Sequence, residues 1–128
     1  MDKYKIYPKQ FRNKRIPIEK NTCFFIMPFA KEFDIVYGTI KNGLQDNYIC
    51  KRVDEISGSI PIINKILVEI LKSQFIIVDL SESNPNVFYE LGIAHTFKDA
   101  QNIFLLKNKN SKVPFDITHL TYIEYDIN

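Results

Sequence analysis

The sequence predicts a single α/β domain in which strands and helices alternate along the chain. From residue 21 onward, short apolar runs typical of buried strands alternate with longer segments whose apolar residues recur at helical spacing. The chain has 128 residues, 45% of them hydrophobic, which is enough to bury one core without stabilising disulfides or metal ions. We therefore expect one domain over residues 21–128, preceded by a separate arm over residues 1–20.

Five strands and three helices are expected within this domain. Apolar and β-branched runs predict strands at 22–27, 48–53, 75–78, 102–106 and 121–125. Apolar residues spaced about 3.6 apart predict helices over 33–44, over 63–71 and from residue 85 through residue 94. The Ser-Gly-Ser turn at 57–59 is expected to lead into the second helix, and 107–112 reads as a polar loop.

This order of elements predicts a parallel sheet, because strands separated by helices of ten or more residues are joined by right-handed crossovers. The expected product is a flavodoxin-like, Rossmann-like three-layer sandwich with a five-stranded parallel sheet in the order 2-1-3-4-5. In that order a ligand crevice opens between the first and third strands, beyond their carboxyl ends.

Glu90 is the strongest candidate for a functional residue. The chain leaves a buried strand at Asp79 and enters a helix, with Asn84 as the expected N-cap and Pro85 at the first helical position. On this helix Glu90 falls beside the apolar stripe, in line with Asn86. A carboxylate there is often only a partner of the helix dipole. Here Asp79, Asn84 and Asn86 are expected to project into the same crevice, which favours a ligand site.

Further side chains are expected close to this crevice. Met27, Pro28 and Phe29 follow the first strand, and Arg52 and Asp54 leave the second strand nearby. Arg52 and Asp54 could bind a phosphate group or ribose hydroxyls of a ligand. Charged residues that leave a strand are also commonly just solvated, and the sequence leaves this choice open.

No metal or cofactor is expected. The chain has four glycines and no G-x-G-x-x-G motif, which argues against a standard dinucleotide fold. His95 and His119 are too few and too far apart to suggest a metal site. Cys23 and Cys50 are expected to be packing residues of a reduced, cytoplasmic protein. With no signal peptide and no apolar run near 20 residues, no membrane partner is expected.

The arm over residues 1–20 is both basic and apolar. Seven basic residues against two acidic ones give it a charge of +5, whereas the whole chain carries +2. Such an arm is most often a solvated tail, although basic arms also bind acidic partners, and nucleic acid is not the favoured one. Its apolar residues instead suggest packing on its own domain or on a second subunit, and we expect a homodimer or a larger homo-oligomer. These residues are Tyr4, Ile6, Tyr7, Phe11, Ile16 and Ile18.

Several motifs, in order and spacing, resemble the nucleoside 2-deoxyribosyltransferase-like proteins, which are distant relatives of TIR domains. They are Phe-Phe-Ile-Met-Pro-Phe at 24–29, Val-Asp-Glu-Ile at 53–56, Phe-Ile-Ile-Val-Asp-Leu at 75–80, the Asn-Pro-Asn-Val-Phe-Tyr-Glu-Leu-Gly-Ile-Ala-His run at 84–95 and Val-Pro-Phe-Asp-Ile-Thr-His-Leu at 113–120. The resemblance covers nearly all of residues 22–125. It implies cleavage of an N-glycosidic bond in a nucleoside or nucleotide, NAD among them, by hydrolysis or deoxyribosyl transfer, in bacterial defence or nucleotide metabolism. The alternative is a TIR-like module that binds a nucleotide signal or self-associates without catalysis.

The resemblance also implies residue roles. Glu90, followed by Gly92, matches the family's catalytic glutamate, and Asp79 matches an acidic residue that contacts base or sugar. Pro28 and Phe29 match one wall of the nucleoside pocket. An anionic carboxylate beneath C1′ would stabilise or capture the oxocarbenium ion that forms as the base departs. Asp79 would then hydrogen-bond or protonate the leaving base.

Two departures from the family pattern favour hydrolysis or nucleotide binding over base exchange. Transferases of the family carry a first-strand tyrosine that steadies the glutamate, where this chain has Phe24 and Phe25. They also carry Gly-Thr or Gly-Ser before the glutamate, where this chain has Asn86 and Val87.

Overall fold

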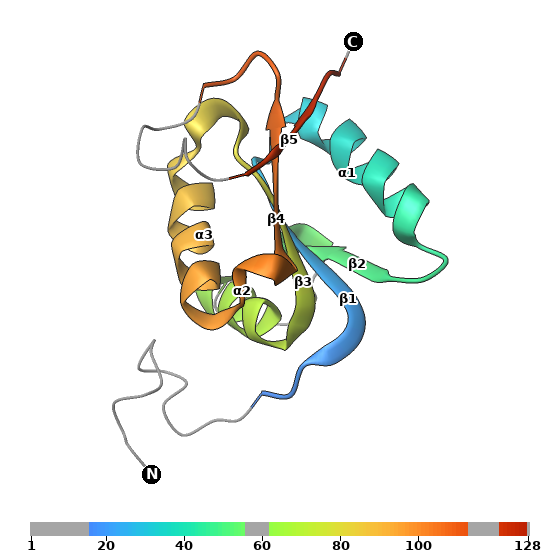
Figure 1. The fold of residues 1–128 in the computed structure, drawn as a ribbon, viewed down its shortest axis with the longest axis vertical. Helices are drawn as coiled ribbons and strands as arrows, with labels where there is room; N and C mark the ends of the chain where they lie inside the picture. Colours follow the sequence, from blue (N-terminus) through green and yellow to red (C-terminus); the bar gives the residue numbers. More distant parts are fainter. Residues whose placement is uncertain (1–15, 56–61, 113–120, 128) are drawn as a thin grey trace.

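The expected α/β sandwich and strand order are confirmed. In the computed structural model, which describes residues 16–55, 62–112 and 121–127, five strands form one sheet in the order β2-β1-β3-β4-β5, and every neighbouring pair is parallel (Figure 1). The strands are β1 (Glu19–Ile26), β2 (Ile49–Arg52), β3 (Ser73–Asp79), β4 (Ile103–Asn108) and β5 (Ile123–Tyr125). The helices are α1 (Lys31–Leu44), α2 (Ile62–Lys72) and α3 (Pro85–Phe97), with single 3₁₀ turns at Val53–Glu55, Ser81–Ser83 and Ala100–Asn102.

The alternation of side chains along the strands divides the core into two layers. Phe24, Ile26, Ile76 and Val78 point toward α2 and α3, whereas their neighbours in sequence point toward α1. Figure 1 shows α2 and α3 on one side of the sheet and α1 on the other. The α1 layer contains Cys23, Phe25, Met27, Phe33, Val36, Tyr37, Cys50, Ile77 and Leu106.

β4 extends two residues further than the sequence predicts, through Lys107 and Asn108. The sequence suggested that residues 107–112 form a loop, but Lys107 and Asn108 continue β4 and pair with Glu124 and Tyr125 of β5. The side chain of Lys107 is nevertheless buried. Its ammonium donates hydrogen bonds to the carbonyl oxygens of Asn108, Lys109 and Ser111 at 3.0, 3.3 and 2.5 Å, and the carboxylate of Glu124 on β5 lies 3.9 Å away. The end of β4, the loop after it and β5 together satisfy the charge.

The two cysteines are packing residues, as expected. Cys23 and Cys50 are buried, unpaired in a disulfide and register partners across β1 and β2. Burial raises the pKa of Cys23 to about 11, which keeps this thiol protonated and unreactive near neutral pH. Several expected features lie outside the described residues: most of the arm over 1–20, the turn at 57–59 and the motif at 113–120 with His119. Within the described part of the chain, no helix is long and apolar enough to cross a membrane.

We predict that Ile70→Ala destabilises the fold by about 2–5 kcal/mol, because Ile70 of α2 is 0% exposed and packs in the core layer between the sheet and helices α2 and α3. Ile35→Ala is the matched control, since Ile35 is 64% exposed on α1 and should change stability by about 0.5 kcal/mol or less. Urea unfolding of both variants measures the difference. Equal effects would contradict the assignment of Ile70 to the core.

Candidate functional site

A small crevice opens at the carboxyl edge of the sheet, where β1 and β2 end against the first turns of α3. It encloses about 30 Å³, roughly the share of one molecule in liquid water. A ligand the size of a nucleoside cannot be enclosed in it and would have to approach from the rim, where Phe29 and Asn86 are exposed. The lining residues are Phe25, Ile26, Met27, Phe29, Arg52, Val53, Asn84, Asn86, Val87 and Glu90.

The structure brings together most of the residues that the sequence assigned to a site. Met27, Phe29, Arg52, Asn84, Asn86 and Glu90 all line this crevice. Pro28 lies between two lining residues, and Asp54 contacts Arg52, but neither is itself part of the lining.

The start of α3 is built as the sequence predicts. Asn84 is the N-cap, and its side-chain oxygen accepts hydrogen bonds from the backbone N–H groups of Asn86 at 2.9 Å and Val87 at 3.3 Å. Pro85 occupies the first helical position, where its missing N–H is not needed. Val87, Leu91 and Ala94 anchor the helix in the core. The cap and this stripe together fix the position of the Glu90 side chain.

Glu90 lies in an environment that disfavours its charge. The residue is half-buried, and burial raises the pKa of its carboxyl group from the ordinary value of 4.5 to about 7. Among the described residues, no hydrogen-bond or ion-pair partner of its side chain is found. Within the described part of the chain, Glu90 is therefore an unpaired carboxyl group whose pKa lies near neutral pH, which is a common property of catalytic acids, bases and nucleophiles.

Arg52 faces the crevice from the end of β2. Its Nη2 donates to Asp34 at 2.8 Å, and its Nε and Nη2 donate to the two oxygens of Asp54, each at 2.9 Å. The guanidinium also stacks over the ring of Tyr37, 4.7 Å from the ring centroid. The residue is 7% exposed, and its Nη1 is buried without a hydrogen-bond partner in the described part of the chain. A buried donor without a partner carries a substantial desolvation penalty, which a ligand acceptor would remove.

The residues that support Arg52 were not foreseen from the sequence. Asp34 pairs with it from α1, and Tyr37 donates a hydrogen bond from its hydroxyl to Glu55, which also pairs with Lys41 at 2.9 Å. Tyr37 lies on the buried face of α1. Its contacts with Arg52 and Glu55 depend on how α1 packs against the end of β2, which periodicity alone does not reveal.

Asp79 does not reach the crevice. It lies at the carboxyl end of β3, as expected, but is 1% exposed and shares the α1 side of the sheet with Ile77. One carboxylate oxygen accepts from the backbone N–H of Ser81 at 2.9 Å, and the other accepts from the hydroxyl of Tyr125 at 2.5 Å. The expected convergence of Asp79 with Asn84 and Asn86 is thus not observed. Its role in catalysis remains a prediction from the family resemblance.

Within the described residues, no group of three or more His, Cys, Asp and Glu side chains is placed to hold a metal ion. The crevice offers one titratable carboxyl group, one cation and two amide side chains. This arrangement can bind a small polar group and present a carboxylate to it.

No model of a known protein family matches the chain, and no curated protein matches it in sequence. Among solved structures, the chain is similar to the TIR domain of the Toll-related receptor TRR-2 from Hydra magnipapillata. The two share 14% identity, with a TM-score of 0.65, over 80% of this chain and 82% of the receptor domain. The chain thus has a flavodoxin-like α/β fold of the TIR type. At this identity the likeness concerns the fold.

Asp79→Asn tests whether that residue supports structure or chemistry. Because Asp79 accepts two hydrogen bonds inside the protein, we expect the variant to lose about 1.5–3 kcal/mol of stability and to keep its ligand affinity. Tyr125→Phe, which removes one of the two donors, should lower the melting temperature in the same direction. Thermal melting and calorimetric titration of both variants give the answer. An unchanged melting temperature with lost affinity would instead support the catalytic role predicted from the sequence.

Glu90→Gln should stabilise the protein above pH 7. A carboxyl group whose folded pKa is raised to about 7 binds more protons in the folded state than in the unfolded state between pH 4.5 and 7. Stability from this group therefore falls as pH rises through that window. We expect Glu90→Gln to gain about 1–3 kcal/mol at pH 8 and almost nothing at pH 4. Denaturant melts at both pH values, with Asp46→Asn in an exposed turn as control, measure this difference; equal gains at the two values would contradict it.

Proposed function

We propose that this chain cleaves the N-glycosidic bond of a nucleoside or nucleotide, with the Glu90 carboxylate acting on C1′. The observation that carries the proposal is the state of Glu90: it is half-buried, unpaired within the described residues and has a pKa near 7, at the mouth of a crevice beyond the strand ends. The order of motifs around it, from Asn84 to His95, supports the same assignment through the family resemblance.

The chemistry requires an ionised carboxyl group beside C1′. As the bond between C1′ and the base nitrogen breaks, its electron pair leaves with the base, which takes a proton from water or an acid. The developing positive charge at C1′ is stabilised by ionised Glu90 or captured as an ester with one of its oxygens. Water then attacks C1′, the ester bond breaks, and the carboxylate is regenerated while the sugar gains a hydroxyl group.

Arg52 is proposed to bind the ligand through Nη1. The charge of its guanidinium is already balanced by Asp34 and Asp54, so the site around it carries no excess of positive charge. This favours an uncharged acceptor, such as a ribose hydroxyl or a base carbonyl, over a phosphate group. Asp54, predicted as a binding residue, would then act indirectly by holding Arg52.

Hydrolysis is favoured over transfer to a second base. The crevice has room for about one water molecule beside Glu90. In addition, Phe24 and Phe25 are buried and provide no hydroxyl to orient the carboxylate, as the tyrosine of the transferases does. Of these two observations, the missing tyrosine hydroxyl is the one that favours hydrolysis, because an acceptor base would approach from the same rim as the leaving base.

A second candidate function is a non-catalytic module that binds a nucleotide or self-associates. The TIR-type fold and the narrowness of the crevice favour it. Purified protein incubated with NAD and with panels of nucleosides and nucleotides separates the two functions. Release of free base, followed by chromatography, supports the enzyme. Saturable binding without release supports the module.

Glu90→Gln should reduce base release at least tenfold without loss of fold, because it removes the charge and keeps the volume. Since the carboxylate is the reactive form, wild-type turnover should rise with pH and reach half its maximum near pH 7. Tyr89→Phe, a change at the exposed neighbour on α3, is the control and should keep wild-type turnover. Retention of more than a tenth of the activity by the Gln variant would remove Glu90 from the mechanism.

A further inference from the structure

The α1 side of the sheet is covered over only part of its width. Among the described residues, α1 is the helix on this side, and it packs over β1 and β2, with the ring of Tyr37 4.9 Å from that of Phe25. Toward β4 and β5 the same side of the sheet is open, so that Phe104 is 43% exposed and Ile123 is 58% exposed. Exposed clusters of large apolar side chains commonly mark binding sites.

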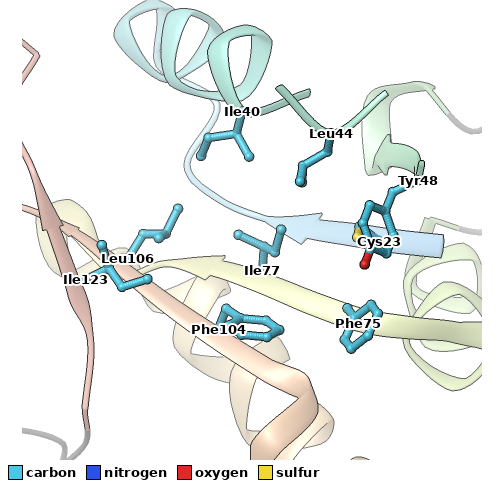
Figure 2. A pocket seen from close by; sticks show the side chains of 9 residues that line it. All are labelled: Cys23, Ile40, Leu44, Tyr48, Phe75, Ile77, Phe104, Leu106 and Ile123. Carbon is cyan, nitrogen blue, oxygen red and sulfur yellow. The ribbon is translucent and has the colours of Figure 1, made fainter. Parts of the chain in front are cut away.

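The open strip contains an apolar groove of about 330 Å³ (Figure 2). Ile40 and Leu44 of α1 form one wall and point toward the sheet, while Phe75 and Phe104 lie opposite them. The groove shares no lining residue with the crevice beside Glu90, so the two are separate hollows. The residues that line the groove are Cys23, Ile40, Leu44, Tyr48, Phe75, Ile77, Phe104, Leu106 and Ile123.

Strand pairing fixes the floor of the groove. Three pairs of register partners form this floor in steps across the sheet: Cys23 with Phe75, Ile77 with Phe104, and Leu106 with Ile123. Along β3 the floor extends from Phe75 to Asp79, the register partner of Leu106, which is a length of about 13 Å. Because backbone hydrogen bonds hold the paired strands, the floor keeps its shape. A long, flat floor beside a single wall suits a planar molecule.

The groove offers a ligand few polar partners. None of its lining residues is Asp, Glu, Lys, Arg or His. The polar groups of the lining side chains are the hydroxyl of Tyr48 and the thiol of Cys23, and burial raises the pKa of this thiol to about 11, so that it stays uncharged near neutral pH. A charged ligand would lose its hydration in the groove without gaining a partner. The groove therefore favours uncharged molecules.

The volume of the groove limits the size of a ligand. A cavity of about 150 Å³ lined by aliphatic and aromatic side chains binds one benzene ring. The groove is about twice as large, and it lies at the lower end of the range of about 300–1,000 Å³ for sites that bind small molecules. A stable interface with another protein chain needs about 800 Å² on each partner, far more than one narrow groove presents. Its size thus fits a molecule of about two fused rings.

Three aromatic side chains line the groove one after another. The centroids of the Tyr48, Phe75 and Phe104 rings are 6.0 and 5.9 Å apart along this row. Aromatic rings attract one another at centroid distances of about 4.5–7 Å, by more than the burial of their area alone provides. A planar aromatic ligand gains this attraction over the row, whereas a saturated ligand of the same size does not.

We propose that this groove is a second ligand site, which binds an uncharged, planar aromatic molecule of about two fused rings. The ligand enters at the open end, beside Phe104 and Ile123, and its rings lie over the floor against Phe75. A single hydroxyl or N–H group of the ligand can face the hydroxyl of Tyr48. The site is independent of the crevice and of the function proposed for it.

Binding of 2-naphthol to the full chain tests this proposal, because 2-naphthol has two fused aromatic rings and one hydroxyl and is uncharged near neutral pH. In calorimetric titrations we expect saturable binding, at least about threefold tighter than that of the saturated alcohol 2-decalol and at least about tenfold tighter than that of the anion 2-naphthoate. The methyl resonances of Leu44, Leu106 and Ile123 should shift on binding, and that of Ile35, which is outside the groove, should not.

Three results would overturn the proposal. They are no binding of 2-naphthol, equal affinity for either comparison compound, and ligand-induced shifts only outside the groove. If the methyl resonances of the groove shift with protein concentration in the absence of ligand, a second copy of the chain is the occupant instead.

A pair of matched substitutions on α1 provides a second readout. Ile40→Trp places a larger side chain in the groove and should weaken 2-naphthol binding at least about tenfold. Ile35→Trp, at a position 64% exposed on the same helix, should leave the affinity unchanged. Because the chain has no tryptophan, a blue-shifted emission of the Ile40→Trp variant verifies that the new ring is buried. A blue-shifted Ile40→Trp variant with wild-type affinity would show that the ligand does not bind in the groove.

Discussion

The fold and the site both depend on the burial of β1. This strand pairs with β2 on one edge and β3 on the other, and its successive side chains enter opposite core layers. Phe24 and Ile26 support α2 and α3, whereas Phe25 and Met27 support α1 and also line the crevice. Because side chains of β1 pack in both core layers, the crevice at the carboxyl end of β1 is bounded by closely packed residues. A change in the packing of β1 would therefore move Arg52 and α3 relative to each other.

Desolvation gives the candidate site its chemical character. The same packing that anchors α3 by Val87 and Leu91 removes water from Glu90, and its pKa rises because the charged form loses hydration without gaining a partner among the described residues. Arg52 shows the opposite arrangement. It is more deeply buried, yet two carboxylates hold it and keep its charge, and a hydrogen bond from Arg52 in turn lowers the pKa of Asp54.

The sequence predicts what depends on local pattern. Periodicity identified the strands and helices, and the Asn84-Pro85 pair located the start of α3. Contacts between distant elements were less accessible. The hydroxyl that binds Asp79 comes from Tyr125, 46 residues later, and the carboxylate that binds Arg52 comes from Asp34 on another layer. The polar run at 107–112 predicts a loop, whereas the carbonyl groups that allow the burial of Lys107 are brought together only in the folded chain.

Two of the hollows in the described part of the protein differ in chemistry. One is the crevice beside Glu90, and the other is an apolar groove on the α1 side of the sheet, lined among others by Leu44, Phe75 and Phe104. The crevice contains the carboxyl group of Glu90 and a guanidinium nitrogen of Arg52 that has no hydrogen-bond partner among the described residues, so water or a polar ligand can form hydrogen bonds there. The groove is lined by apolar side chains, and water gains little from entering it. A ligand that forms hydrogen bonds is therefore expected to bind in the crevice, whereas an apolar group is expected to bind in the groove.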